Sequence, residues 1–185
     1  MGRVGMQVDR ASILIASLLL GLTLSVPCSM VATAQQAPDL IKQSRTSAIS
    51  ERQIRGIFNA MATATKQQDV DGIVKYMAPT IAIKMTLRLG KGSQQLNLTR
   101  EEYRQYLEQG FAITQRYSSQ YKNLKIQIAP NGQTGTATYT LVEEVTLKNQ
   151  PVTVRSTSQE TVKFEGIKGE ILATAVTSTS TIEVK

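Results

Sequence analysis

The chain contains no histidine and no tryptophan among its 185 residues, and its single cysteine is Cys28. Without histidine, a Ser-His-Asp triad, a Cys-His nucleophile pair and a histidine-containing zinc site are all excluded. Cys28 lies in a segment that we interpret below as a signal peptide, so the mature chain is expected to contain neither a disulfide nor a reactive thiol. We expect no metal and no cofactor.

The first 34 residues are predicted to be a cleavable signal peptide. Arg3 and Arg10 precede an uncharged apolar run at residues 11–26, and the small-residue triplet Ala32-Thr33-Ala34 ends the segment. This order is typical of a signal-peptidase substrate. The run is shorter than the roughly 20 residues of a membrane-spanning helix. An uncleaved anchor is therefore the less favoured alternative, and a lipid-modified Cys28 is less favoured still. We expect cleavage after Ala34, a secreted or periplasmic protein, and no membrane span after cleavage.

The charge of the chain is positive but evenly distributed. Twenty-one Lys and Arg residues against 14 Asp and Glu residues give a net charge of +7. The basic residues of the mature chain occur singly between Lys42 and Lys185, with no run and no interleaved aromatic residues that would follow a nucleic-acid strand. We therefore expect a solvated basic surface and no nucleic-acid partner.

Residues 35–49 are polar and are predicted to be a flexible tether, followed by one domain over residues 50–185. Two capping boxes, Ser50 to Gln53 and Thr99 to Glu102, predict helices over residues 50–66 and 99–116. Asp69 is the expected N-cap of a short helix that ends before Pro79.

Alternation of apolar and polar residues predicts a half-buried strand over residues 80–89, followed by a turn and a short extended piece that ends at residue 98. Four further strands are expected after the last helix, at residues 120–129, 136–147, 152–164 and 170–184. Asn-Gly and other glycine-containing turns join them as antiparallel hairpins. The predicted fold class is α+β, with the order helix, helix, strand, helix and then a four-strand meander.

Residues 54–78 contain the most specific local pattern, a helix followed by the turn Asp69-Val70-Asp71-Gly72 and a short second helix. Together with the order of elements over residues 50–184, this pattern resembles the nuclear transport factor 2-like superfamily, including its SnoaL-like and ketosteroid-isomerase-like branches. The resemblance implies a cone, in which a curved antiparallel sheet wraps a long first helix and leaves an apolar pocket at its open end. It does not imply one function, because such folds include isomerases, hydrolases, cyclases, binding modules and oligomerisation domains.

The catalytic groups of the ketosteroid-isomerase branch do not carry over to this chain. The resemblance places that branch's oxyanion-hole tyrosine at Met61 and its general-base aspartate near Met85. A thioether neither accepts a substrate proton nor stabilises an enolate, and that reaction needs both roles inside an apolar site. We therefore do not expect this isomerase activity. Met61 and Met85, together with Phe58, are instead expected to line a ligand site.

Two glutamates are the candidate polar groups of the cone. A period of two places Glu143 and Tyr139 on the apolar face of strand 136–147, and places Ser156, Ser158 and Glu160 on one face of the next strand. Two carboxylates and two hydroxyls, together with Tyr139, are then expected to point into the cone. A desolvated carboxyl there can act as an acid or a base. In the alternative, both glutamates lie at the rim and the serines have no role beyond the sheet.

Three functions follow from this arrangement. The first interpretation is an exported, non-catalytic binding or assembly module that holds a small apolar or amphipathic ligand in the cone or a protein partner against the sheet. One alternative is a small lyase, isomerase or hydrolase that uses Glu143, Glu160 and Tyr139. A second alternative is a structural domain that forms a homodimer through the outer sheet face, which presents Thr138, Thr140, Arg155, Thr157, Gln159 and Thr161.

Overall fold

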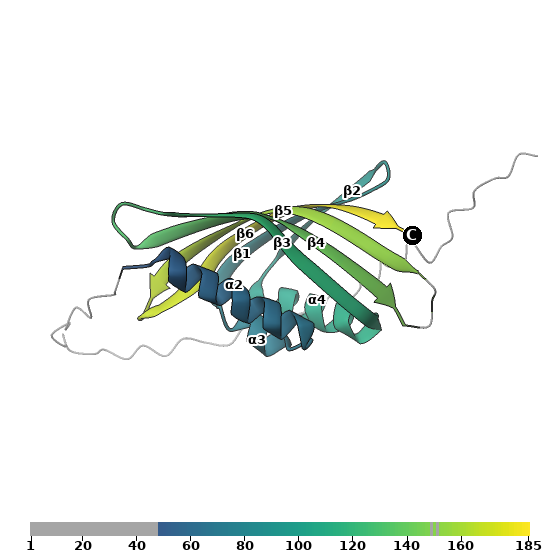
Figure 1. Cartoon of the computed structure of the whole chain (residues 1–185), viewed down its shortest axis with the longest axis horizontal. Helices are drawn as coiled ribbons and strands as arrows, with labels where there is room; N and C mark the ends of the chain where they lie inside the picture. Colours follow the sequence, from purple (N-terminus) through teal and green to yellow (C-terminus); the bar gives the residue numbers. More distant parts are fainter. Residues whose placement is uncertain (1–47, 149, 151) are drawn as a thin grey trace, which may run out of the picture. The chain divides into compact units, whose positions relative to one another are not determined.

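A computed structural model describes residues 48–148, 150 and 152–185 of the chain (Figure 1). The predicted signal peptide and all but the last two residues of the predicted tether lie outside these residues. No helix in the described part of the chain is long and apolar enough to cross a membrane. In chain order the elements are α2 (Glu51–Lys66), α3 (Val70–Val74), β1 (Met77–Leu89), β2 (Gly92–Leu98), α4 (Arg100–Ile113), β3 (Thr114–Ile128), β4 (Thr134–Leu147), β5 (Thr153–Ile167) and β6 (Glu170–Val184).

The helices begin where the capping residues predict. The Ser50 hydroxyl accepts the Gln53 backbone N–H at 3.3 Å, and the Gln53 side chain accepts the Ser50 backbone N–H at 2.9 Å. Thr99 and Glu102 form the same reciprocal pair at the start of α4. Each box satisfies backbone donors that have no partner within the helix. Both predicted capping boxes are confirmed.

The six strands form one sheet in the order β2-β1-β6-β5-β4-β3. The four-strand meander is confirmed, since β3, β4, β5 and β6 are antiparallel neighbours. The sheet is mixed, however, because β1 pairs with β6 in parallel. Hairpin turns fix only the directions of consecutive strands, whereas β1 and β6 come together after the intervening helix and meander. The prediction of a wholly antiparallel sheet is wrong at this one pairing.

Two boundaries also differ from the sequence prediction. The extended piece before residue 98 is the full strand β2, which pairs with β1 from Leu89 opposite Gly92 to Ile83 opposite Leu98. Helix α4 ends at Ile113 rather than at residue 116, because Thr114 is extended and its hydroxyl donates to the Gly110 carbonyl at 2.7 Å. Strand β3 therefore starts at Thr114, six residues earlier than expected.

Helix α2 packs its apolar side against the concave face of the sheet. Figure 1 shows α2 and α4 on the same side of the curved sheet. Ile54 and Phe58 are buried, and the Phe58 ring meets the rings of Tyr139 and Phe164 edge-on, with centroids 5.0 and 6.0 Å away. The prediction that this side of the first helix lies against the concave side of the sheet is confirmed.

The folded part begins before residue 50. Ile49 is buried, and its backbone N–H donates to the Gly132 carbonyl at 2.8 Å in the turn between β3 and β4. The predicted tether therefore ends earlier than residue 49. An apolar side chain at this position has a place in the core, which a boundary drawn from polar composition alone does not reveal.

Candidate functional site

Residues of four neighbouring strands form rows across the concave face. Met85 of β1 is opposite Ser178 of β6, Ser178 is opposite Glu160 of β5, and Glu160 is opposite Tyr139 of β4. Because every second residue of a strand faces the same side, the rows that follow lie on this face as well. They contain Leu141, Ser158 and Ser180 in one row, and Glu143, Ser156 and Ile182 in the next.

Glu160 accepts hydrogen bonds on both carboxyl oxygens. The Tyr139 hydroxyl donates to Oε2 at 2.6 Å and the Ser178 hydroxyl donates to Oε1 at 3.3 Å. Burial raises the pKa of Glu160 to about 7; the two hydrogen bonds oppose this rise, and the charge of Glu143 adds to it. A carboxyl with this pKa exists in both protonation states near neutral pH.

Glu143 has a separate set of partners. The Tyr117 hydroxyl of β3 donates to its Oε1, and the Ser156 hydroxyl of β5 donates to its Oε2 at 3.0 Å. Glu143 is half-buried, as is Glu160. Both carboxyls are therefore held by hydroxyl donors on the concave face without being sealed from solvent.

The two carboxyls occupy separate positions on the face, although the charge of Glu143 contributes to the raised pKa of Glu160. Glu143 lies four residues beyond Tyr139 on β4, and Tyr139 is directly opposite Glu160. Four residues of strand correspond to roughly 13 Å along β4. Tyr139 hydrogen-bonds Glu160, whereas Tyr117 bonds Glu143. Each carboxyl therefore has a tyrosine of its own.

Three buried serines support the row that contains Glu160. The hydroxyls of Ser158 and Ser180 lie 2.7 Å apart, and those of Ser178 and Ser180 lie 3.4 Å apart. All three side chains are at most 5% exposed. Since buried hydroxyls need hydrogen-bond partners, this chain fixes the Ser178 hydroxyl that donates to Glu160.

Helix α4 brings aromatic rings to the same face. Tyr103 and Tyr106 stack at 6.1 Å, and the Phe111 ring meets the Tyr117 ring edge-on at 6.3 Å. Burial raises the pKa of Tyr103 well above its usual range, and the charges of Glu160 and Glu143 raise it further. None of the residues of α4 is fully buried.

The predicted site residues lie partly in the core and partly at half-buried positions. Phe58, Tyr139 and Ser158 are buried, and Phe58 is a core residue rather than one that meets a ligand. The remaining predicted residues are half-buried on the concave side: Met61, Met85, Glu143, Ser156 and Glu160.

The sequence interpretation missed three residues that touch the glutamates or their support. Tyr117 fell between the predicted helix end and the predicted start of the next strand, although Tyr117, Ser119 and Tyr121 alternate as strand residues do. Ser178 and Ser180 were considered only as parts of a Ser- and Thr-rich last strand. Both serines follow Val176 at a spacing of two residues, which places all three on the same face of the strand; this spacing was the available signal.

The outer face of the sheet is hollowed by about 540 Å³. Four of the six residues predicted for that face line the hollow, namely Thr138, Thr140, Gln159 and Thr161, together with Thr177 and Thr179 of β6. The other two predicted residues do not: Arg155 lies 3.9 Å from Glu144, and Thr157 is exposed. Most of this lining consists of hydroxyl and amide groups, and Lys125, Tyr139 and Glu160 also border the hollow.

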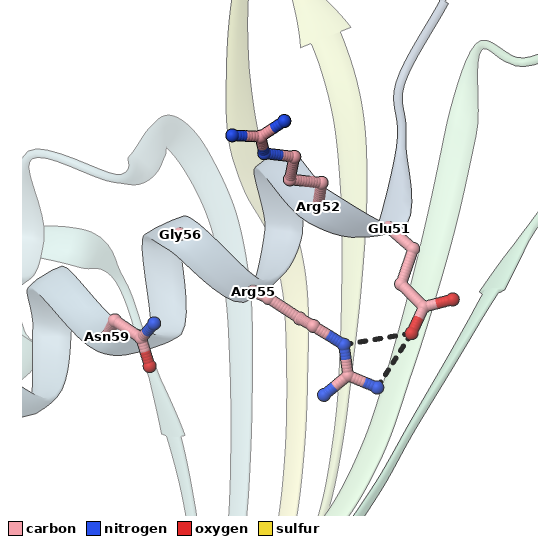
Figure 2. A pocket seen from close by; sticks show the side chains of 5 residues that line it. All are labelled: Glu51, Arg52, Arg55, Gly56 and Asn59. Atoms are coloured by element: carbon pink, nitrogen blue, oxygen red, sulfur yellow. Dashed lines mark hydrogen bonds and ion pairs between the residues drawn. The ribbon is translucent and has the colours of Figure 1, made fainter.

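A second hollow, of about 480 Å³, lies along the exposed side of α2 (Figure 2). Figure 2 shows Arg55 turned toward Glu51, with which it forms an ion pair of 2.6 Å. Both side chains are about half exposed. Glu51 and Arg55 are thus paired with each other on a solvated helix surface, so the concave face is the better candidate site.

No protein-family model matches the sequence, and no curated protein sequence matches it significantly. Solved structures match its fold. A protein from Novosphingobium aromaticivorans, described provisionally as a scytalone dehydratase, superposes with a TM-score of 0.60 at 9% identity, over 72% of this chain and 85% of that one. A hexachlorocyclohexane dehydrochlorinase, LinA type 2, superposes with a TM-score of 0.56 at 8% identity, over 71% of this chain and 86% of that one. An NTF2-like protein of unknown function from Pseudomonas putida superposes with a TM-score of 0.54 at 15% identity, over 70% of this chain and 84% of that one. At these identities the likeness establishes the fold, which is the nuclear transport factor 2-like cone.

Proposed function

We propose that this chain is an exported module that binds a small amphipathic ligand on the concave face of its sheet. The observation that carries the proposal is the state of Glu143 and Glu160, which are held by tyrosine and serine hydroxyls yet remain half-buried. Apolar side chains next to a few fixed polar groups are the usual composition of a small-molecule site. The proposal of export rests on the sequence of the first 34 residues.

The test compares bulk added to the two faces of one strand. Leu141→Trp fills the concave face between the rows of Glu160 and Glu143, whereas Thr140→Trp adds the same bulk to the outer face. Thermal-shift and calorimetric titration would use amphipathic phenylalkyl compounds with different head groups. Binding by wild type and Thr140→Trp that is lost in Leu141→Trp supports the proposal. Binding that survives in Leu141→Trp, with an unchanged fold by circular dichroism, contradicts it.

A second candidate is an acid-base enzyme that uses the same face. The specific observation in its favour is Glu160, whose pKa of about 7 suits proton transfer at neutral pH and whose carboxyl has a phenol donor at 2.6 Å. The dehydratase-like protein and the dehydrochlorinase above share the fold, so the cone accommodates enzymes. Turnover that is abolished in Glu160→Gln without loss of fold would favour this candidate over the binding module.

The third alternative, a homodimer through the outer face, gains less support. Homodimer interfaces are rich in apolar area, whereas the hollow of the outer face is lined mainly by threonines, with Gln159, Asn123, Lys125, Tyr139 and Glu160. A dimer remains a prediction that light scattering on the purified protein can measure. The outer-face variant Thr140→Trp should weaken such a dimer if it forms.

A further inference from the structure

The carboxyls of the concave face have no basic partner within the described residues. The ion pairs there join Arg55 to Glu51, Arg104 to Asp71 and Glu101, and Arg155 and Lys185 to Glu144. Glu143 and Glu160 take part in none of them. Although the chain has a net charge of +7, no lysine or arginine forms an ion pair with the two carboxyls of this face in the described part of the chain. A bound cation could balance their charge.

The two carboxyls of this face keep free acceptor positions. An ionised carboxylate offers about four acceptor positions, and each glutamate receives two hydrogen bonds from hydroxyls. The donor protons of Tyr117, Tyr139 and Ser156 are therefore already committed. Acceptor positions remain on both carboxyls, and a ligand fills them only if it brings donors of its own.

Aromatic rings surround these acceptors. Tyr103 and Tyr106 of α4, Tyr117 and Tyr121 of β3, and Phe111 all lie half-buried on this side of the sheet. The π face of such a ring attracts a cation, most strongly where water is partly excluded. Ring faces also pack well against the apolar body of a ligand.

We infer that the ligand of the concave face is an organic cation, an ammonium group on an apolar or aromatic body, with the ammonium on the Glu160 carboxyl and the body among the rings. This inference rests on the proposed function of the same face and narrows it to one chemical class. An anionic head group would meet two carboxyls with no basic side chain to offset them. A neutral head group could donate a hydrogen bond to a carboxylate but would gain no attraction between opposite charges.

Binding of a cation should increase with pH between 6 and 8. The titratable groups that face Glu160 are Tyr139 and Glu143 of β4, Tyr121 of β3 and Tyr103 of α4. Burial raises the pKa of each of these three tyrosines, so they stay neutral over this range. Glu160, with a pKa of about 7, changes from mostly protonated to mostly ionised. The affinity for a cation should rise about tenfold over these two pH units.

The experiment uses three ligands that share a phenylbutyl body: 4-phenylbutylamine, 4-phenylbutanol and 4-phenylbutyrate. Their affinities for the purified mature protein would be measured by calorimetry at pH 6 and pH 8. The variants are Glu160→Gln, Glu143→Gln and the control Glu144→Gln. Glu144 lies beside Glu143 on β4 but is exposed and paired with Arg155 and Lys185.

We expect the amine to bind roughly tenfold to hundredfold more tightly than the alcohol at pH 8, because only the ammonium adds an attraction between opposite charges. Glu160→Gln should remove most of this preference together with its pH dependence, Glu143→Gln should reduce it, and Glu144→Gln should keep it. Equal affinity for the amine and the alcohol, with both lost in Leu141→Trp, overturns the inference but leaves the proposed function standing. Tighter binding of the butyrate also overturns the inference. Failure of all three ligands to bind overturns both.

Discussion

The Tyr139 hydroxyl donates a 2.6 Å hydrogen bond to Glu160 Oε2 across directly paired positions of β4 and β5. The same tyrosine packs edge-on against Phe58, with ring centroids 5.0 Å apart. One side chain thus connects the core under α2 to the carboxyl of the candidate site. Because Tyr139 is fixed by the core, it fixes Glu160 in turn.

Tyr139→Phe should raise the pKa of Glu160 further above about 7, because the hydrogen bond from Tyr139 favours the ionised carboxylate. Carboxyl carbon chemical shifts, followed by NMR across pH 4 to 9, would measure the change. Tyr76→Phe is the control, since the Tyr76 ring lies instead against Lys75. A pKa of Glu160 that stays the same or falls in Tyr139→Phe would contradict the role assigned to this hydrogen bond.

The stability of wild type should fall as the pH rises from about 4.5 to 7. Glu160 binds its proton more tightly in the folded state, where its pKa is about 7, than in the unfolded chain, where the ordinary value of 4.5 applies. This contribution to the unfolding free energy is complete below the unfolded-state pKa of 4.5 and is lost as the pH rises through the folded-state pKa of about 7. The total loss is about 3 kcal/mol.

Glu160→Gln should remove this component of the pH dependence, whereas Glu144→Gln should keep it. Urea unfolding of wild type and both variants at pH 4.5, 6 and 8 would measure how the unfolding free energy of each protein changes with pH. A wild-type slope that persists in Glu160→Gln would assign the titration to another group.

Phe58→Ala should cost roughly 3 to 5 kcal/mol of unfolding free energy, as expected for truncation of a buried aromatic side chain. Phe58 is 4% exposed and its ring contacts three other rings. Ile113→Ala, at a position that is 40% exposed, should cost under about 0.5 kcal/mol. A loss below about 1 kcal/mol for Phe58→Ala would show that α2 contributes little to the core.

N-terminal sequencing of the protein secreted by a native-like host should begin at Gln35. The prediction rests on the order of Arg3, Arg10, the apolar run and the triplet Ala32-Thr33-Ala34. A mature chain that still contains residues 1–26 would instead support the uncleaved anchor.

Local signals in the sequence predicted most of the fold. Ser50, Asp69 and Thr99 set the helix starts through short-range hydrogen bonds, and alternation set the strands. The parallel pairing of β1 with β6 was not predictable from such signals, because it joins segments that are distant in the chain. Alternation also placed Glu143, Tyr139 and Glu160 on the concave face, but it did not reveal Tyr117 or which tyrosine pairs with which carboxyl. These pairings depend on the register between strands, and β3 shifts its register between Lys122 and Lys125, where Asn123 has a φ of 56°.

The central claim is that the concave face binds a small amphipathic ligand, and methionine methyl NMR tests it most directly. Residues 35–185 contain three methionines: Met61 and Met85, which are half-buried on the concave side, and Met77, which is 4% exposed in the core. On titration with 4-phenylbutylamine or 4-phenylbutanol, we predict saturable shifts of the Met61 and Met85 methyl signals and an unchanged Met77 signal. Binding detected by calorimetry that leaves the Met61 and Met85 methyl signals unchanged would contradict the account, because the ligand would then lie on another surface.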